Sequence, residues 1–373
     1  MPVYLDHNAT TPVEPRVLAA MLPYLEEGFG NPSSGHAFGA AAAAAVATAR
    51  EQVAALLGCR PAEVTFTGGG TESNNLALVG AVAARGGGGH LVTTVVEHPS
   101  VLAACRHLER RWDSSVTYLP VDRDGRVDPD DVARAVTAAT VAVSVMHANN
   151  ETGVLQPIAE IARAIRGRGV LLHTDAAQSV GKVPARVDEL SADLLSVAGH
   201  KLYGPKGVGA LYARGGVALE PVLHGAGQEC GLRPGTENVA GIVGLGAACA
   251  LAAETLPDEA ARVAALRDRL WQALGAAGWL RNGHGVEVLP NTLNVSVDGA
   301  DGTELLARAP EVAASTGSAC HTGRTEPSAV LTAMGLPEPR ALGAVRLSLG
   351  RCTSAEDVDA AAAALVRAAR STR

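Results

Sequence analysis

Polar residues that could do chemistry follow several short apolar runs. The turn at residues 67–75 is rich in glycine and leads into an apolar helical stretch. Its backbone could cradle an anion such as phosphate, although an ordinary strand-to-helix turn would look the same. No Gly-Lys-Ser/Thr follows it, which excludes a Walker motif. His98 and Asn150 lie after two further apolar runs. Taken alone, His98 is more typical of a capping or turn residue than of a ligand site, and Asn150 is only a weak signal of one.

Asp175 and Lys201 are the most informative of these residues. Asp175 directly follows an apolar run, where a buried carboxylate needs a cationic or hydrogen-bond-donating partner. Lys201 lies between a Gly-His pair and a Gly-Pro turn, unlike a typical solvated lysine. An aspartate, a lysine and an anion cradle together point to pyridoxal 5′-phosphate. The lysine would form the Schiff base, the aspartate would keep the pyridine nitrogen protonated, and the cradle would hold the phosphate.

Cys320 is the cysteine whose surroundings favour reactivity. It lies in a polar, glycine-containing stretch, residues 315–327, where His321 and Arg324 could favour the thiolate and the glycines would allow movement. The other cysteines are expected to be structural: Cys59, Cys105, Cys230, Cys249 and Cys352. No Cys-x-x-Cys pair occurs, so we expect neither a disulfide scaffold nor a metal site.

The elements that must position these residues alternate between strands and helices. The seven predicted strands are residues 63–67, 90–96, 115–119, 141–147, 170–174, 194–197 and 209–212. The predicted helices between them include residues 38–57, 73–84, 99–110, 129–138 and 157–166. This order predicts an α/β fold with a mostly parallel seven-stranded sheet between helices. Ligands in such folds bind beyond the carboxyl ends of the strands.

The pattern of predicted helices and strands changes near Pro257. An amphipathic helix is predicted at residues 258–274, followed by strands near 291–297 and 344–349 and a last helix at 355–370. We therefore predict a large domain at residues 13–256, a smaller α+β domain at 257–373 that carries the Cys320 segment, and an N-terminal arm at 1–12 that joins the small domain. Residues 239–253 are apolar but too short to span a bilayer, which predicts a buried or interface helix.

Composition limits the function further. The 373 residues are 47% hydrophobic and 18% charged, so a disordered chain is excluded. The formal net charge of −7 and the lack of a long basic run argue against direct binding of nucleic acid or of a membrane surface. The first residues have neither a basic nor an apolar signal-peptide region, so a cytoplasmic location is expected.

Taken together, the motifs resemble the cysteine desulfurases, which are fold-type I pyridoxal-phosphate enzymes of aminotransferase class V. The matching segments are residues 4–12, 29–34, 69–76, 199–201, 232–238, 293–296, 317–320 and 346–351. The resemblance covers almost the whole chain with its motifs in order. It implies a fold-type I transferase that acts as a homodimer.

The resemblance also implies individual roles. Lys201 would bind the cofactor and shuttle protons, and His98 would stack on the pyridine ring and assist proton transfer. Asp175 would pair with the ring nitrogen and Gln178 with the phenolic oxygen. Gly70, Thr71 and His200 would hold the phosphate, joined by Thr236 from the other subunit. The full set of implied cofactor-binding residues is Gly70, Thr71, His98, Asn150, Asp175, Gln178, His200, Lys201 and Thr236.

For the substrate, the resemblance implies that Asn150, Arg346 and Asn31 bind L-cysteine, with the first two on its carboxylate. The catalytic residues would be Cys320, Lys201 and His98: Cys320 would take the sulfur as a persulfide and pass it to a protein acceptor while L-alanine leaves. The sequence departs from the family in having Ala198 where a serine is usual. One phosphate-binding hydroxyl is lost, so cofactor affinity would be lower unless Ser196 or a water substitutes.

Three alternatives remain open at this point. The motifs around Cys320 and residues 233–238 look as much like those of a selenocysteine lyase. An aminotransferase or another lyase of the same fold is a second alternative, because a fold does not determine its reaction. A catalytically silent scaffold or cofactor-binding regulator is a third, although the presence of both Lys201 and Cys320 argues against it.

Overall fold

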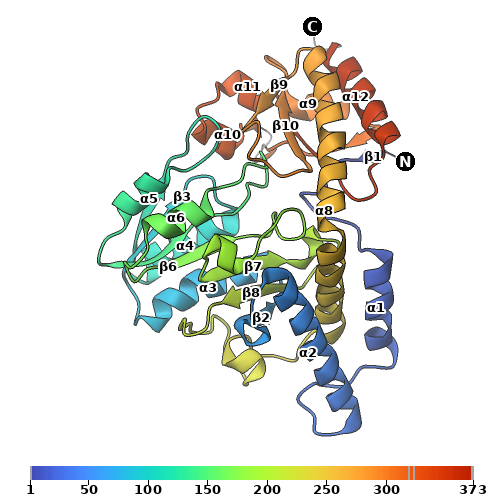
Figure 1. The fold of residues 1–373 in the computed structure, drawn as a ribbon. Helices are drawn as coiled ribbons and strands as arrows, with labels where there is room; N and C mark the ends of the chain where they lie inside the picture. Colours follow the sequence, from blue (N-terminus) through green and yellow to red (C-terminus); the bar gives the residue numbers. More distant parts are fainter. Residues whose placement is uncertain (1, 318–319, 322–323, 371–373) are drawn as a thin grey trace.

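The computed structural model describes residues 2–317, 320–321 and 324–370. A seven-stranded sheet lies between helices in the N-terminal part of the chain, and a smaller C-terminal part adjoins it along one long helix (Figure 1). The strands of the sheet, in spatial order, are β2 (Val64–Thr67), β8 (Gly209–Ala213), β7 (Leu194–Ala198), β6 (Leu171–Asp175), β5 (Thr140–Ser144), β3 (His90–Thr94) and β4 (Ser115–Leu119). Strand β8 is antiparallel to both neighbours, and all other pairs are parallel.

The predicted seven-stranded, mostly parallel sheet is confirmed. Every residue of the central strands β3, β5 and β7 is buried, as expected for strands that helices cover on both faces. The predicted strand at 115–119 has the observed boundaries, and the other six differ from the prediction by one to three residues at one or both ends. The predicted strand at 90–96 ends at Thr94, and the predicted strand at 141–147 ends at Ser144, so the polar residues that follow lie at the carboxyl edge of the sheet.

Helices of the large part begin where the sequence supplies caps. His98 and Asp128 accept hydrogen bonds from the first turns of two helices, each of which has proline in that turn. The predicted helix at 129–138 ends at Ala135, because Val136 is extended. The helices are α1 (Pro15–Glu26), α2 (Ala37–Leu57), α3 (Gly70–Ala84), α4 (Pro99–Arg111), α5 (Pro129–Ala135), α6 (Ile158–Ala164) and α7 (Val187–Leu190), with a short 3-10 turn η1 (Pro61–Glu63).

One helix, α8 (Val239–Ala276), replaces the two predicted near residues 239–253 and 258–274. The predicted break near Pro257 is wrong. Proline removes one donor from the helix, but Ala253 and Pro257 both lie on the exposed face, so water can satisfy the freed carbonyl. By length and composition, α2 and α8 could each cross a membrane. The core helices of soluble proteins pass the same test, so this is weak evidence for a membrane span. In this structure the two helices pack against each other.

The C-terminal part contains a three-stranded antiparallel sheet in the order β14-β10-β9. The N-terminal strand β1 (Val3–Tyr4) pairs in parallel with β11 (Val312–Ala313), which brings the start of the chain to this part. The remaining strands are β9 (Leu280–Asn282), β10 (Thr292–Ser296), β12 (Cys320–His321), β13 (Arg324–Thr325) and β14 (Ala344–Ser348). The helices are α9 (Gly302–Ala307), α10 (Ala329–Ala333), α11 (Glu338–Leu342) and α12 (Ala355–Arg370), the last as predicted.

Two large hydrophobic cores support the division into domains. The first surrounds the seven-stranded sheet and includes Ile242 and Leu245 from the first half of α8. The second includes Leu270 and Leu274 from the end of α8, strands β10 and β14, and Leu5 from the arm. The boundaries at 12 and 256 remain a prediction, and α8 runs through the second of them.

A buried ion pair fixes the loop between β8 and α8. Glu229, whose side chain is only 3% exposed, lies in the short turn η3 (Gln228–Gly231) with a left-handed backbone. Both of its carboxylate oxygens accept hydrogen bonds from Arg50 of α2, at 2.6 and 2.8 Å, and one also accepts from the backbone N–H of Phe66. The Arg50 guanidinium lies 4.6 Å from the centre of the Phe66 ring. The loop that continues to Thr236 is therefore anchored to the edge of the sheet.

We predict that Arg50→Met lowers the free energy of unfolding by about 3 kcal/mol, because it leaves the Glu229 carboxylate buried without its cation. Urea denaturation followed by circular dichroism measures this change. Arg269→Met is the control, because Arg269 pairs with Asp359 on the exposed surface and its loss is expected to have no measurable effect. Equal losses in the two variants would contradict the importance of burial at Glu229.

Candidate active site

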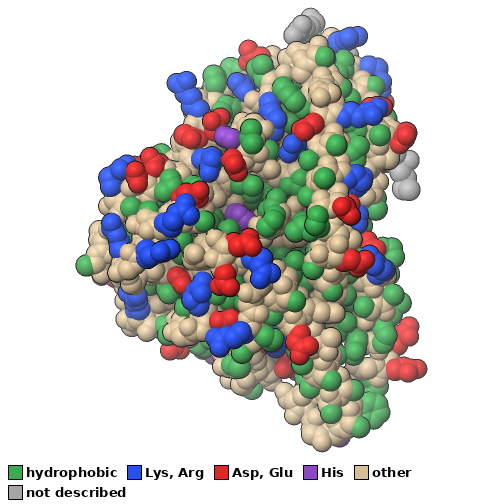
Figure 2. Space-filling model, in the orientation of Figure 1, with side chains coloured by type: hydrophobic (Ala, Val, Ile, Leu, Met, Phe, Trp, Pro, Cys, Tyr) green, Lys and Arg blue, Asp and Glu red, His purple; other side chains and the backbone are tan. Residues whose placement is uncertain are grey.

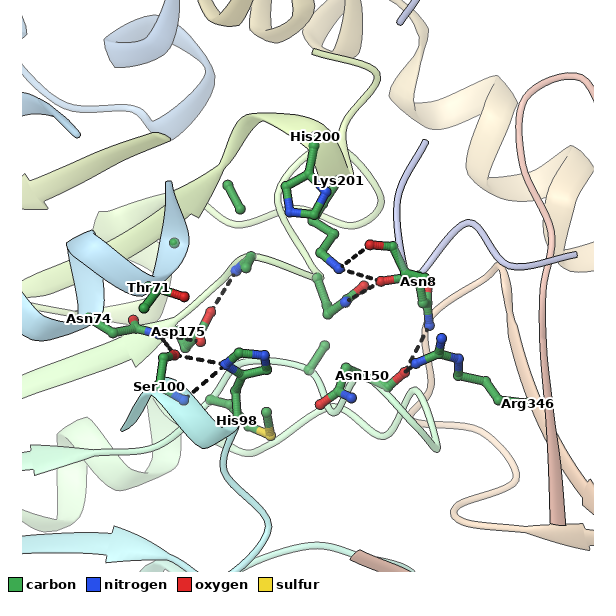
Figure 3. A pocket seen from close by; sticks show the side chains of 17 residues that line it. Asn8, Thr71, Asn74, His98, Ser100, Asn150, Asp175, His200, Lys201 and Arg346 are labelled. Atoms are coloured by element: carbon green, nitrogen blue, oxygen red, sulfur yellow. Dashed lines mark hydrogen bonds between the residues drawn. The ribbon is translucent and has the colours of Figure 1, made fainter. Parts of the chain in front are cut away.

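A cavity of about 410 Å³ lies at the carboxyl ends of the central strands (Figure 3). It contains nine of the twelve residues predicted for the site, which are Gly70, Thr71, His98, Asn150, Asp175, Gln178, His200, Lys201 and Arg346. Strands β3, β5, β6 and β7 lead directly into the segments that carry most of them, as the parallel topology predicts. Residues far apart in the chain thus surround one small volume.

Lys201 ends the 3-10 turn η2 (Gly199–Lys201) that follows β7. Its Nζ donates to the backbone carbonyls of Asn8 and Ala9, at 2.5 and 2.8 Å (Figure 3). Burial, and then the positive charge of Arg346, lower the pKa of Lys201 to about 8. A larger fraction of its amine is therefore uncharged near neutral pH than for an ordinary lysine, and the uncharged amine is the nucleophile.

Asp175 finds the donors that its burial requires. Its Oδ2 accepts a hydrogen bond from Asn74 Nδ2 at 2.7 Å, and its Oδ1 accepts one from the backbone N–H of Ala177 at 2.9 Å. Asn74 also donates to Ser100 Oγ, so it connects Asp175 to the start of α4. The expectation of a partner is met by neutral donors, which keep the carboxylate in place and leave its charge available to a bound group.

His98 caps α4, and the cap fixes its ring. The backbone N–H of Ser100 donates to His98 Nδ1, and the Ser100 hydroxyl lies 2.7 Å from the same atom. A ring nitrogen that accepts a backbone N–H is unprotonated, so the ring proton lies on Nε2. Burial lowers the pKa of His98, which favours this neutral form.

The glycine-rich turn, for which the sequence suggested an anion cradle, leads directly into the first turn of α3. Gly69 has a φ of 143°, which side chains rarely allow, and α3 begins at Gly70 with free backbone N–H groups. A Cβ added at Gly70 would lie 3.3 Å from the Cβ of Ala198, which is a tight contact. His200 lies at the same end, and burial followed by the charge of Lys201 lowers its pKa to about 4.

Ser196 does not replace the hydroxyl missing at Ala198. Its side chain is fully buried within β7, and its Oγ lies 3.0 Å from His173 Nε2. It also lies outside the set of residues that line the cavity. The suggested substitution by Ser196 is therefore wrong. Side chains alternate along a strand, so residues 196 and 198 point to the same face of β7. Ser196, however, lies two residues before the carboxyl end of the strand, further from the cavity than Ala198.

Arg346 of β14 lies opposite this cradle. Its guanidinium donates to Asp6 Oδ1 at 2.7 Å and to the backbone carbonyl of Asn150 at 3.1 Å. Its Nε is buried and has no hydrogen-bond partner in the part of the chain described here. A guanidinium held from two sides with one buried donor unused is suited to a carboxylate ligand.

The residues around the cavity fit pyridoxal 5′-phosphate. The start of α3 can receive a phosphate, the fixed carboxylate of Asp175 can receive a protonated ring nitrogen, and Lys201 offers an amine with a lowered pKa. These three features lie around one cavity, which is the arrangement that the sequence predicted.

Three predicted residues lie outside this set. Thr236 and Asn31 are exposed and do not line the cavity. The backbone of Cys320 pairs with Thr325 in a short hairpin formed by β12 and β13, but its side chain lies outside the described part of the structure. The predicted mobility of residues 315–327 likewise concerns positions that are only partly described.

Sequence reasoning assigned no role to Asn8 or Glu97. Asn8 lines the cavity, and its backbone carbonyl accepts from both Lys201 Nζ and Gln178 Nε2. Glu97 is buried beside His98. Its Oε1 accepts from Thr94 Oγ1 and from the backbone N–H of Met146, and its Oε2 has no hydrogen-bond partner among the residues that the structure describes. The only available signal was that both are polar residues next to motif residues.

Known proteins resemble this chain in both sequence and structure. Residues 3–361 match the family described as Aminotransferase class-V. A protein named cysteine desulfurase from Gluconacetobacter diazotrophicus is 48% identical over 364 residues, which cover 96% of this chain and 90% of that protein. A protein named cysteine desulfurase IscS from Anaeromyxobacter dehalogenans is 49% identical over 365 residues, with the same coverage of 96% and 90%.

Among solved structures, one titled NifS-like protein superposes with a TM-score of 0.92 at 38% identity, covering 98% of this chain and 99% of that one. Another, titled SspA in complex with cysteine, has a TM-score of 0.84 at 40% identity and covers 93% and 98% of the two chains. The chain therefore belongs to the class V aminotransferase family of fold-type I enzymes and, within it, to the cysteine desulfurases.

We predict that Glu97 makes the protein less stable as the pH rises. Burial raises the pKa of Glu97 to about 8, above its ordinary value of 4.5, so folding favours the protonated form. Its stabilising effect is fully present below pH 4.5 and is lost as the pH rises toward 8. The free energy of unfolding of the wild type, relative to that of Glu97→Gln, is expected to fall by about 3 kcal/mol between pH 5 and pH 8.

Urea titrations of both proteins at several pH values measure this difference. Glutamine keeps the oxygen that accepts from Thr94 and Met146 but cannot ionise, so it is the matched control for charge. Parallel stability curves for the two proteins would contradict a protonated Glu97.

Proposed function

We propose that this cysteine desulfurase uses pyridoxal 5′-phosphate to convert L-cysteine to L-alanine, with transfer of the sulfur to Cys320 as a persulfide and then to a protein acceptor. The observation that carries this proposal is the grouping of Lys201, Asp175 and the start of α3 around one cavity, with Arg346 on its far side. The names of the relatives support L-cysteine as the substrate.

Each residue around the cavity has a part in holding the cofactor. Lys201 would bind it covalently, Asp175 would accept from its ring nitrogen, and Gln178 would face its phenolic oxygen. His98, in its neutral form, would lie against the ring. The phosphate would be held by Gly70, Thr71 and His200, joined by Thr236 of a second subunit. When bound, the cofactor supplies an electron sink for the carbanion that forms at the substrate α-carbon.

Arg346 and Asn150 are suited to hold the carboxylate of L-cysteine. The guanidinium already donates to the Asn150 carbonyl and to Asp6, so its plane is fixed before substrate arrives. The unused Nε of Arg346 would gain a partner when the carboxylate binds. The proposed contact of Asn31 with the substrate would require its exposed side chain to approach from a neighbouring subunit.

Lys201 and His98 are positioned for proton transfer. The Lys201 amine, with a pKa of about 8, can accept the α-proton of the substrate at Nζ and return it near neutral pH. The carbonyls of Asn8 and Ala9 provide a place for this amine whenever it is not bonded to the cofactor. With its Nδ1 accepting a backbone N–H, His98 would carry a proton on Nε2 that it could donate to a basic atom of the bound substrate.

The sulfur step balances without an added oxidant. The Cys320 thiolate attacks the substrate sulfur, the sulfur–sulfur bond forms, and the bond from that sulfur to the substrate β-carbon breaks. The β-carbon keeps the electron pair and takes up a proton to become the methyl group of alanine.

The described cysteines outside this segment are free thiols, as a reducing, cytoplasmic location requires.

We predict that Cys320→Ala binds the cofactor normally but loses sulfide release from L-cysteine by at least about 100-fold, because no thiolate remains to accept the sulfur. Sulfide and alanine are measured in the presence of dithiothreitol, and the cofactor band is measured by absorbance. Cys352→Ala is the control, because Cys352 is exposed and does not line the cavity.

Selenocysteine is the parallel substrate in the same assay. Turnover of selenocysteine without turnover of L-cysteine by the wild type would replace the proposal with a selenocysteine lyase. Full activity of Cys320→Ala on L-cysteine would remove Cys320 from the mechanism.

A homodimer is the second part of the proposal. Helix α1 exposes Leu18, Leu22 and Leu25 at a spacing that places them on one face, and Phe29 and Phe38 stack nearby while 74% and 59% exposed. Figure 2 shows charges of both signs scattered over the visible face, with hydrophobic side chains among them where α1 lies. The exposure of Thr236 outside its own cavity is consistent with a contribution to a partner's site.

We predict that the double variant Leu22→Asp/Phe29→Asp is a monomer while the wild type is a dimer, because two charges cannot be buried in an apolar interface. Sedimentation velocity measures the mass of each. Val286→Asp is the control, because Val286 is 80% exposed on the C-terminal part and its replacement is expected to leave the dimer intact. A monomeric wild type, or a dimeric double variant, would contradict the proposed interface.

A further inference from the structure

The chain has three lysines and 28 arginines, and all three lysines lie at or beside the cavity. Lys201 lines it, and Lys206 lines the adjoining hollow with Gly70 and His200. Lys182 is buried behind it and has no part in the mechanism above. Arginine stays charged in almost any environment, whereas a buried lysine can lose its proton. A buried lysine in a chain that otherwise uses arginine for its cations therefore requires an explanation.

Lys182 contacts two residues of the site. Its Nζ donates to Gln178 Oε1 at 2.9 Å and to Asn8 Oδ1 at 3.1 Å. Gln178 lies one turn earlier in the segment that follows β6, and both partners line the cavity. No carboxylate forms an ion pair with Lys182 among residues 2–317, 320–321 and 324–370.

The surroundings of Lys182 favour its uncharged form. Burial, and then the positive charges of Lys201 and Arg346, hold the pKa of Lys182 well below its ordinary value of 10.5. An uncharged amine has two N–H groups, and the two oxygen acceptors match them. An ammonium group would carry a third proton without an acceptor in this contact set.

The contact with Lys182 decides which way the Gln178 amide faces. The oxygen and nitrogen ends of an amide have nearly the same shape, so only hydrogen bonds choose between the two orientations. Because Lys182 donates to Oε1, the donor Nε2 must take the opposite side, where it reaches the backbone carbonyl of Asn8 at 3.0 Å. In a rotated amide, Nε2 would face the Lys182 N–H groups, donor against donor.

We propose that Lys182 is a positioning residue that fixes the Gln178 amide so that its Nε2 is presented to the phenolic oxygen of the cofactor. The inference rests on the proposed function, because it uses the role given there to Gln178. The Lys182 amine also donates to the side-chain oxygen of Asn8, and the backbone carbonyl of Asn8 accepts a hydrogen bond from Lys201 Nζ. Lys182 would act on the cofactor through these two neighbours.

The test measures the cofactor band of the holoenzyme between pH 6 and pH 10 in four proteins: wild type, Lys182→Met, Gln178→Ala and the double variant. A donor on the phenolic oxygen stabilises its ionised form, so losing it is expected to raise the pH midpoint of the band in Gln178→Ala by about 1 unit. Lys182→Met is expected to raise it in the same direction. The double variant should shift no further than Gln178→Ala alone, because Lys182 would act only through that amide.

Two controls separate positioning from other effects. Thr140→Val removes a buried hydrogen bond to His90 at the amino end of β5, far from the carboxyl-end cavity, so it should lower the melting temperature without moving the band. If Lys182→Met does not fold, Lys182→Leu, which likewise lacks an N–H donor, is used in its place, with a shift in the same direction expected. An additive shift in the double variant would mean that Lys182 acts by its charge and would overturn the inference.

The remaining outcomes distinguish the role of Lys182 from the role of Gln178. A shifted band in Gln178→Ala with an unshifted band in Lys182→Met would overturn the role of Lys182 alone. An unshifted band in Gln178→Ala would overturn the role of Gln178 in the proposed function, and this inference with it.

Discussion

A single buried asparagine on the N-terminal arm connects the three parts of the chain that form the site. The backbone N–H of Asn8 donates to Ser348 Oγ, and its side-chain amide donates to Thr292 Oγ1 and to the backbone carbonyl of Asn150. Its side-chain oxygen accepts from Lys182 and Asn291. Because each polar group is satisfied by a different segment, the arm, the large sheet and the small sheet can meet in few other ways.

Burial at this junction sets the chemistry of the groups around it. The same loss of water that requires the Asn8 network lowers the pKa of Lys201 to about 8 and that of His200 to about 4, and raises that of Glu97 to about 8. The site therefore holds fewer charges than its residue types suggest. The side chains of Asp175 and Arg346 lie at opposite ends of the cavity (Figure 3).

Much of this arrangement follows from the sequence, since strand–helix alternation and polar residues after apolar runs are local patterns. They predicted the sheet, the cradle and the grouping of Asp175 with Lys201. What the sequence did not reveal depends on contacts between distant segments. The continuity of α8 through Pro257 depends on an exposed carbonyl, and the roles of Asn8, Glu97 and Lys182 depend on partners from other segments of the chain. The failure of Ser196 to substitute for the residue 198 hydroxyl likewise depends on its bond to His173.

Helix α8 has a consequence for how the protein loses its structure. Its first half supplies Ile242 and Leu245 to one hydrophobic core, and its second half supplies Leu270 and Leu274 to the other. If one core unfolds, α8 loses the apolar contacts of one half while its other half is still packed in the other core. Unfolding of the two cores is therefore coupled through this helix. Cooperativity is thus built into the backbone itself. Because both parts of the chain line the cavity, losing either core would also remove one of its walls.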